Sequence, residues 1–208
     1  MKTLGIYGGS FDPIHLGHLL LAEAAREELA LDNVVFIPAA QSPMKNHRPY
    51  ISDADRLELI KLAIQDNPSF TFSDVELKRK PPSYTIDTLS FFCQTYPNHQ
   101  LFLLMGQDSL NTLTGWRHFT QLFSLATLAV GVRPGFPSRV PQALAAYQHP
   151  SAQSKGIVFF DNPEVGISSS AIRERLRLGK SVRYWLAPQV RKYILENKLY
   201  TYNEEKKP

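Results

Sequence analysis

The sequence has a single cysteine, Cys93, and no long apolar run. One cysteine cannot form an intrachain disulfide or build a cysteine-rich zinc site. No apolar stretch approaches the roughly 20 residues that cross a bilayer, and Gly8 and Gly9 interrupt the first apolar run too early for a secretory signal. These absences exclude a disulfide-rich scaffold and a membrane-spanning protein, and they predict a cytoplasmic location.

Two familiar phosphate-binding fingerprints are also missing. The chain contains neither G-x-G-x-x-G nor G-x-x-x-x-G-K-[ST]. Each of these motifs sets glycine-rich backbone at a helix N-terminus against phosphate groups. Their absence argues against a dinucleotide-dependent hydride-transfer enzyme and against a P-loop kinase.

The composition is that of one ordinary folded domain. The chain has 208 residues, of which 43% are hydrophobic and 20% charged, which excludes a disordered chain. Its net charge of +4 is unevenly spread, because residues 1–104 carry −3 and residues 105–208 carry +7. A basic second half predicts an anionic ligand, held either at a compact phosphate site or along an extended RNA-binding track.

Short apolar segments alternate with amphipathic ones along the chain. We predict strands over residues 3–7, 34–37, 70–77, 101–105 and 127–132. We predict helices over residues 17–29, 52–64, 85–96 and 188–197, and a loop-rich interval over 134–150. This alternation is typical of βαβ units with a parallel sheet, so the fold class is α/β. We expect one domain, with a core over about residues 1–165 and a small helical part over about 166–202.

The segment from Gly8 to His18 directly follows the first predicted strand. Its glycines allow a ligand to approach the backbone closely, and His15 and His18 stand three residues apart at a helix start. Residues at this spacing share a helical face, so both imidazoles could meet an anion together with the positive end of the helix dipole. Two unrelated histidines are the plain alternative. A zinc site would need further ligands, which Cys93 and the other histidines do not obviously supply.

Residues 9–18, GSFDPIHLGH, resemble the G-[ST]-F-D-P-x-H-x-G-H signature of the nucleotidylyltransferase superfamily. Residues 167–173, ISSSAIR, resemble its second motif, I-S-S-[ST]-x-I-R. Three further stretches, PSYTIDT at 82–88, GQDS at 106–109 and WR at 116–117, resemble the bacterial nicotinate mononucleotide adenylyltransferases. The resemblance covers essentially the whole chain and implies a Rossmann-like parallel sheet with helices on both faces.

The resemblance implies a function in NAD biosynthesis: transfer of the adenylyl group of ATP to nicotinate mononucleotide, giving nicotinate adenine dinucleotide and pyrophosphate. The residues implied to be catalytic are His15, His18 and Arg173. Those implied to bind ATP are Gly8, Gly9, Ser10, Phe11, His15, His18, Gly106, Asp108, Ser168, Ser169 and Arg173. Those implied to bind nicotinate mononucleotide are Lys45, Thr85, Asp108, Trp116 and Arg117.

Magnesium is expected to arrive with ATP, because no cluster of carboxylates indicates a protein-held metal site. We expect no nucleic-acid partner and no membrane partner, and an oligomer of identical chains is left open. Asp12 is expected to orient its loop by hydrogen bonding. Met44 stands where the family often has histidine, so that contact is either lost or supplied by another group such as His47.

Other functions remain as alternatives. Phosphopantetheine adenylyltransferases share the first motif but lack the three later stretches. A non-catalytic nucleotide-binding module would not need His15, His18 and Arg173 together. The sequence does not set the preference between nicotinate and nicotinamide mononucleotide.

Overall fold

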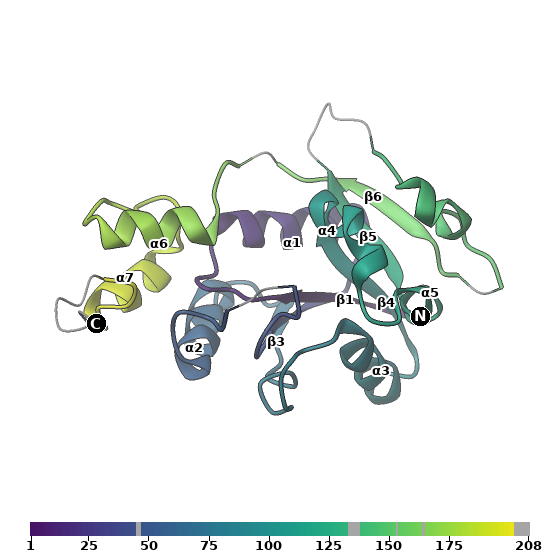
Figure 1. The fold of residues 1–208 in the computed structure, drawn as a ribbon, viewed down its shortest axis with the longest axis horizontal. Helices are drawn as coiled ribbons and strands as arrows, with labels where there is room; N and C mark the ends of the chain where they lie inside the picture. Colours follow the sequence, from purple (N-terminus) through teal and green to yellow (C-terminus); the bar gives the residue numbers. More distant parts are fainter. Residues whose placement is uncertain (45–46, 133–137, 153, 164, 202–208) are drawn as a thin grey trace.

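The computed structural model describes residues 1–44, 47–132, 138–152, 154–163 and 165–201 (Figure 1). Its centre is a six-stranded sheet in the order β3-β2-β1-β4-β5-β6, in which every neighbouring pair is parallel. The strands are β1 (Lys2–Gly9), β2 (Asn33–Pro38), β3 (Phe70–Phe72), β4 (His99–Gly106), β5 (Thr127–Val132) and β6 (Ile157–Asp161). The predicted α/β class is therefore confirmed.

Helices cover both faces of the sheet. The first face carries α1 (Leu16–Glu28) and α2 (Asp53–Ile64), and the buried side chains of α6 (Ser169–Arg177) and α7 (Pro188–Glu196) join the same core cluster. The second carries α3 (Thr85–Thr95), α4 (Gln107–Asn111), α5 (Phe119–Leu125) and the 3-10 turns η1 (Leu113–Gly115) and η2 (Gln142–Tyr147). Strand side chains alternate between the two layers, so that in β4 Leu103 packs toward the second face and Leu104 toward the first. Burial on both faces explains the continuous apolar runs in the sequence.

The helix starts follow local chemistry that is visible in the sequence. Ser52 caps α2 by accepting a hydrogen bond from the Asp55 amide at 3.0 Å. Ser168 caps α6 in the same way, from the Ala171 amide at 3.2 Å. Pro188 begins α7, at a position where its missing N–H costs nothing.

The predicted elements differ from the structure at one strand and in one loop interval, and some elements were not predicted. The strand predicted over residues 70–77 ends at Phe72, because the chain then turns through Asp74–Lys78 with Lys78 N donating to Asp74 O at 3.2 Å. The α5 helix and β6 were not predicted, and η2 lies inside the interval predicted as loop. These segments are short, and their apolar side chains find partners only across the fold, so local periodicity does not reveal them.

The order of the strands places a topological switch beside β1. From β1 the chain moves outward through β2 and β3, whereas β4, β5 and β6 lie on the other side. Ile6 pairs with Leu103, so Gly9 and Gly106, each three residues further on, end β1 and β4 at the same level. Open parallel sheets bind ligands at such a point, at the carboxyl ends of the strands. In Figure 1, α6 and α7 lie on the side toward which β1 runs.

The division of the chain near residue 165 stays a prediction. The buried side chains of α6 and α7, including Ile172 and Ile194, belong to the same core cluster as those of α1 and α2. Within the described residues, no helix is long and apolar enough to cross a membrane.

Candidate active site

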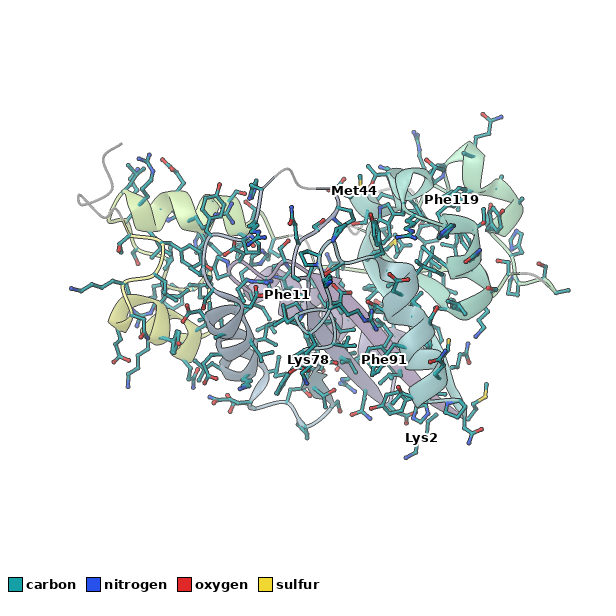
Figure 2. The ribbon with its side chains drawn as sticks, turned by 60° about the horizontal axis from the view of Figure 1, so that its bottom comes forward. Lys2, Phe11, Met44, Lys78, Phe91 and Phe119 are labelled. Carbon is teal, nitrogen blue, oxygen red and sulfur yellow. The ribbon has the colours of Figure 1, made fainter. Side chains whose placement is uncertain are left out.

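The loop between β1 and α1 is anchored by the buried ring of Phe11. This side chain is 1% exposed and contacts the rings of Tyr7, Phe36 and His18, with centroids 5.5, 5.8 and 5.1 Å away. A Cβ added at Gly9 would lie 3.0 Å from the Phe11 ring, so Gly9 is required by packing. Figure 2 shows the polypeptide running from Lys2 at one edge to Phe11 near the middle of the molecule.

His15 and His18 form a stacked pair at the start of α1. Their ring centroids are 3.7 Å apart and their planes differ by 24°. His15 is the residue before the helix, and its backbone N–H donates to His18 Nδ1 at 3.2 Å. Because His18 Nδ1 is an acceptor, the neutral imidazole carries its proton on Nε2 and can donate from there.

The two histidines differ in their surroundings. His15 is 7% exposed, and its buried Nδ1 has no hydrogen-bond partner among the described residues. Burial lowers the pKa of His15 to about 4, because the charged imidazolium would lose its hydration. His15 is therefore neutral at pH 7. A neutral His15 avoids the repulsion that two imidazolium ions would suffer at this distance.

The second motif meets the first at the beginning of α6. Ser169 Oγ donates to Pro13 O at 2.9 Å, and Arg173 Nη1 donates to Asp12 O at 2.6 Å. These bonds join residues more than 150 positions apart. They bring a guanidinium and the positive end of a nine-residue helix to the loop that carries the histidines. Such an arrangement of donors and positive charge suits a polyphosphate.

Asp12 connects this loop to two other segments of the chain through its buried carboxylate. Its carboxylate is buried and accepts hydrogen bonds from the Tyr50 N–H and the Tyr200 hydroxyl, both at 2.8 Å. Burial, followed by the nearby charge of Asp12, raises the pKa of Tyr200, which keeps the phenol protonated as a donor. The hydrogen bonding predicted for Asp12 is therefore confirmed, and its role in orienting the loop stays a prediction.

A second group of predicted residues lies around the start of α3. Thr85 is the first residue of that helix, and the guanidinium of Arg117 sits 4.6 Å from the centre of the Tyr84 ring. Arg117 and its neighbour Trp116 therefore lie beside the PSYTIDT stretch. The Trp116 ring is half-buried, with its Nε1 unpaired among the described residues.

Hydrogen bonds donated by two successive backbone amides connect this second group to β1. Ala39 N donates to Gly9 O at 2.9 Å, and the next residue, Ala40, donates to Ser83 Oγ at 3.0 Å. Ser83 directly precedes Tyr84. The segment after β2 thus ties the end of β1 to the start of α3, and it holds the two predicted substrate regions in a fixed relation.

Two buried charged residues were not singled out from the sequence. Arg56 is fully buried and donates to Ser10 O at 2.7 Å and to Asp53 Oδ1 at 2.6 Å. Glu76 is 6% exposed and accepts from Thr88 Oγ1 at 2.6 Å, and burial raises its pKa. Charged residues on amphipathic segments usually face water, so only their positions in the fold reveal them.

Most of the remaining residues singled out from the sequence lie at the surface or beside open space. A Cβ at Gly8 or Gly106 would meet no heavy atom within 4 Å, so both glycines border open space. Asp108 is exposed in the first turn of α4, and Met44 is 55% exposed. The ring of His47 lies beside that of Tyr50, with centroids 5.2 Å apart. Lys45 lies outside the described residues.

A doubly wound parallel sheet with paired imidazoles, a helix N-terminus and an arginine at its switch point is the arrangement of a nucleotidyltransferase. Residues 6–175 match the cytidylyltransferase-like family. The chain is 40% identical over 200 residues to the nicotinate-nucleotide adenylyltransferase of Bacillus subtilis, covering 96% of this chain and 99% of that one. It is 42% identical to a probable nicotinate-nucleotide adenylyltransferase of Desulfitobacterium hafniense, with 96% of both chains covered.

The chain therefore belongs to the nicotinate-nucleotide adenylyltransferase family, and it is an enzyme. Its fold is similar to that of the Plasmodium falciparum nicotinic acid mononucleotide adenylyltransferase solved in complex with NaAD. The TM-score is 0.77 at 18% identity, covering 96% of this chain and 98% of that one.

Proposed function

We propose that this enzyme transfers the adenylyl group of ATP to nicotinate mononucleotide, forming nicotinate adenine dinucleotide and pyrophosphate. The membership in the family supports this reaction. The observation that carries it is the junction of the two motifs, where Arg173 reaches the Asp12 carbonyl beside the His15–His18 pair. In this reaction a 5′-phosphate oxygen of the mononucleotide attacks the α-phosphorus of ATP in line. A new P–O bond forms, the bond from the α-phosphorus to the bridging oxygen breaks, and pyrophosphate leaves.

The chemistry needs charge stabilisation more than proton transfer. The attacking phosphate is already an anion at pH 7, so no base has to activate it, and pyrophosphate leaves as an anion. Catalysis then consists of holding two anions together and neutralising the charge that builds on the transferred group. We assign the Nε2–H of His18 to the oxygens at the α-phosphorus, with His15 beside it as a neutral partner. We assign Arg173, Ser168, Ser169 and the amides at the start of α6 to the β- and γ-phosphates.

Magnesium enters this proposal as part of the ATP substrate. Among the described residues there is no group of three or more histidine, cysteine or carboxylate side chains placed to hold a metal ion. The donors of the site are imidazoles, amides and a guanidinium, which suit phosphate oxygens and not a hard cation. Bound Mg²⁺ would lower the charge of the triphosphate, and the residues named above would position it.

The region around Thr85 is assigned to the nicotinate mononucleotide. The indole of Trp116 offers a flat face for the cationic pyridine ring. Thr85, the amides at the start of α3 and the backbone near Arg117 offer donors to the carboxylate. We place Asp108 near the ribose and phosphate, and we assign Lys45 to a phosphate. A carboxylate-binding pocket favours nicotinate over nicotinamide mononucleotide.

A direct assay tests the reaction. The purified protein is incubated with ATP, Mg²⁺ and either nicotinate or nicotinamide mononucleotide, and pyrophosphate release is followed together with formation of the dinucleotide. We expect pyrophosphate release when ATP and a mononucleotide are both present, and a higher kcat/KM for nicotinate mononucleotide than for nicotinamide mononucleotide. No pyrophosphate release with either mononucleotide would overturn the proposal. Release from ATP only when phosphopantetheine replaces the mononucleotide would instead indicate a phosphopantetheine adenylyltransferase.

A further inference from the structure

We propose that Tyr50 is a positioning residue for Arg173, and that its ring holds the guanidinium in the orientation in which it meets the triphosphate. The role of Arg173 in this statement rests on the proposed function. The centre of the Arg173 guanidinium lies 4.2 Å from the centroid of the Tyr50 ring. This distance is well within the range of a cation–π contact.

The exposure of Tyr50 requires an explanation other than core packing. The residue is 63% exposed, on the segment that leads into α2. Its ring contacts His47 at the side, with centroids 5.2 Å apart. An aromatic ring in water gains little by staying in one place unless a specific partner holds it there. Arg173, from α6 at the opposite end of the sequence, is that partner.

One residue fixes both members of the pair. The Asp12 carboxylate accepts from Tyr50 N at 2.8 Å, and the Asp12 carbonyl accepts from Arg173 Nη1 at 2.6 Å. Asp12 is 4% exposed, and Tyr200 donates to its other carboxylate oxygen at 2.8 Å. The backbone of Tyr50 and the guanidinium of Arg173 are thus both hydrogen-bonded to the same buried residue of the histidine loop.

The contact leaves the guanidinium able to bind an anion. Arg173 also donates from Nη2 to Ser170 Oγ at 3.2 Å, so the guanidinium is held at two points in its own plane. The guanidinium has five N–H donors, of which Asp12 and Ser170 accept from one each, and the cation–π contact with Tyr50 adds a third restraint on its position. This contact leaves N–H groups for a phosphate. An arginine fixed in advance loses less side-chain entropy when ATP binds.

The test compares variants at Tyr50 by MgATP binding without mononucleotide, by steady-state kinetics and by thermal unfolding. Tyr50→Phe keeps the ring, and Tyr50→Leu keeps apolar bulk without it. We expect Tyr50→Leu to raise the Kd of MgATP by about two- to five-fold, the effect of one exposed cation–π contact, and to lower kcat/KM for ATP similarly. Tyr50→Phe should match the parent in both, and both variants should unfold at the parental temperature.

A matched control is available on β3. Phe72 is 40% exposed and carries the Lys61 ammonium 5.5 Å from its ring centroid, but it belongs to no assigned substrate region. Phe72→Leu should leave the Kd of MgATP unchanged. In an Arg173→Met background, Tyr50→Leu should cause no further loss of affinity, because its effect acts through the guanidinium.

The proposal is overturned if Tyr50→Leu binds MgATP like the parent, if Tyr50→Phe loses as much affinity as Tyr50→Leu, or if the effects of Tyr50→Leu and Arg173→Met add. Failure of the proposed function would look different, because the parent enzyme itself would then release no pyrophosphate from ATP and nicotinate mononucleotide. The binding measurement does not depend on that turnover.

Discussion

The ring of His15 folds back over Gly17 and stacks on the ring of His18. A Cβ added at Gly17 would lie 3.1 Å from His15 Nδ1 and 3.2 Å from His15 Cε1. Real Cβ contacts are seldom so short, so the glycine between the histidines is what lets the imidazoles meet at 3.7 Å. The glycine between the two histidines of the motif is therefore explained by packing, independently of any role in the reaction.

Gly17→Ala should lower the catalytic rate while changing the free energy of unfolding little. The methyl group would push the His15 ring aside and disturb the stack, and a displacement of this kind near reacting atoms costs about 10- to 100-fold in rate. Alanine is the better helix former by roughly 1 kcal/mol, so the free energy of unfolding should fall little. Kinetics and denaturant unfolding on the same preparation check both parts. A variant with the parental kcat would show that the stack is not needed.

His18→Ala should reduce kcat by about 10²- to 10³-fold, the usual scale for removing one transition-state donor. The KM for ATP should change much less, because the arginine and helix contacts remain. Pyrophosphate release under saturating substrates measures this. The exposed His149 provides the control, since His149→Ala should keep the parental rate. Equal turnover by His18→Ala and the parent would contradict the role assigned to His18.

Two neighbouring glycines should respond differently to alanine. At Gly8 the methyl group would meet no heavy atom within 4 Å, so Gly8→Ala should fold normally. It should nevertheless raise the KM for ATP about 10-fold, because the added methyl blocks close approach of the nucleotide. At Gly9 the methyl would lie 3.0 Å from the Phe11 ring, and Gly9→Ala should cost about 1–3 kcal/mol of unfolding free energy. If Gly8→Ala instead lost stability and kept the parental KM for ATP, the nucleotide would not bind beside Gly8.

Stability should fall in mild acid because of His15. Its folded pKa of about 4 lies below the ordinary value of 6.5, so the unfolded chain binds the proton more readily. This contribution is complete above pH 6.5 and is lost as the pH falls toward 4. Between pH 7 and pH 4.5 the loss should be roughly 2–3 kcal/mol. Denaturant unfolding of the parent and of His15→Gln at several pH values measures this loss. If the unfolding free energy of the two proteins depends on pH in the same way, the loss does not come from His15.

Arg56 should support the fold of the histidine loop. Arg56→Met would remove the buried donor to the Ser10 carbonyl and should lower the unfolding free energy by about 2–4 kcal/mol. Arg56→Lys should not restore it, because one ammonium cannot reproduce the forked geometry. Lys61→Met is the control on the same helix, since Lys61 pairs with Glu58 at the surface and should contribute less than about 0.5 kcal/mol. Similar losses for the two methionine variants would contradict the proposed support.

The sequence predicted much of this fold because parallel strands and capped helices are encoded locally. Ser52 and Ser168 mark helix starts in both sequence and structure. The missed elements are short ones such as β6, whose five residues pair with β5 only after the chain has crossed the sheet. The segment after β3 shows the opposite error, since Glu76 lies in a turn and its carboxylate is buried, whereas a strand was predicted through residue 77.

For the site, the sequence by itself determined which residues are proposed to carry the chemistry: His15, His18 and the motif that ends in Arg173. Their identity and spacing are written in consecutive residues, so no fold is needed to find them. Only the tertiary structure decided how they meet. The bond from Arg173 to the Asp12 carbonyl spans 161 positions, and the bond from Tyr200 to the Asp12 carboxylate spans 188. Tyr50 and Arg56 join the same loop through contacts between elements, and contacts made by packing leave no periodic trace in the sequence.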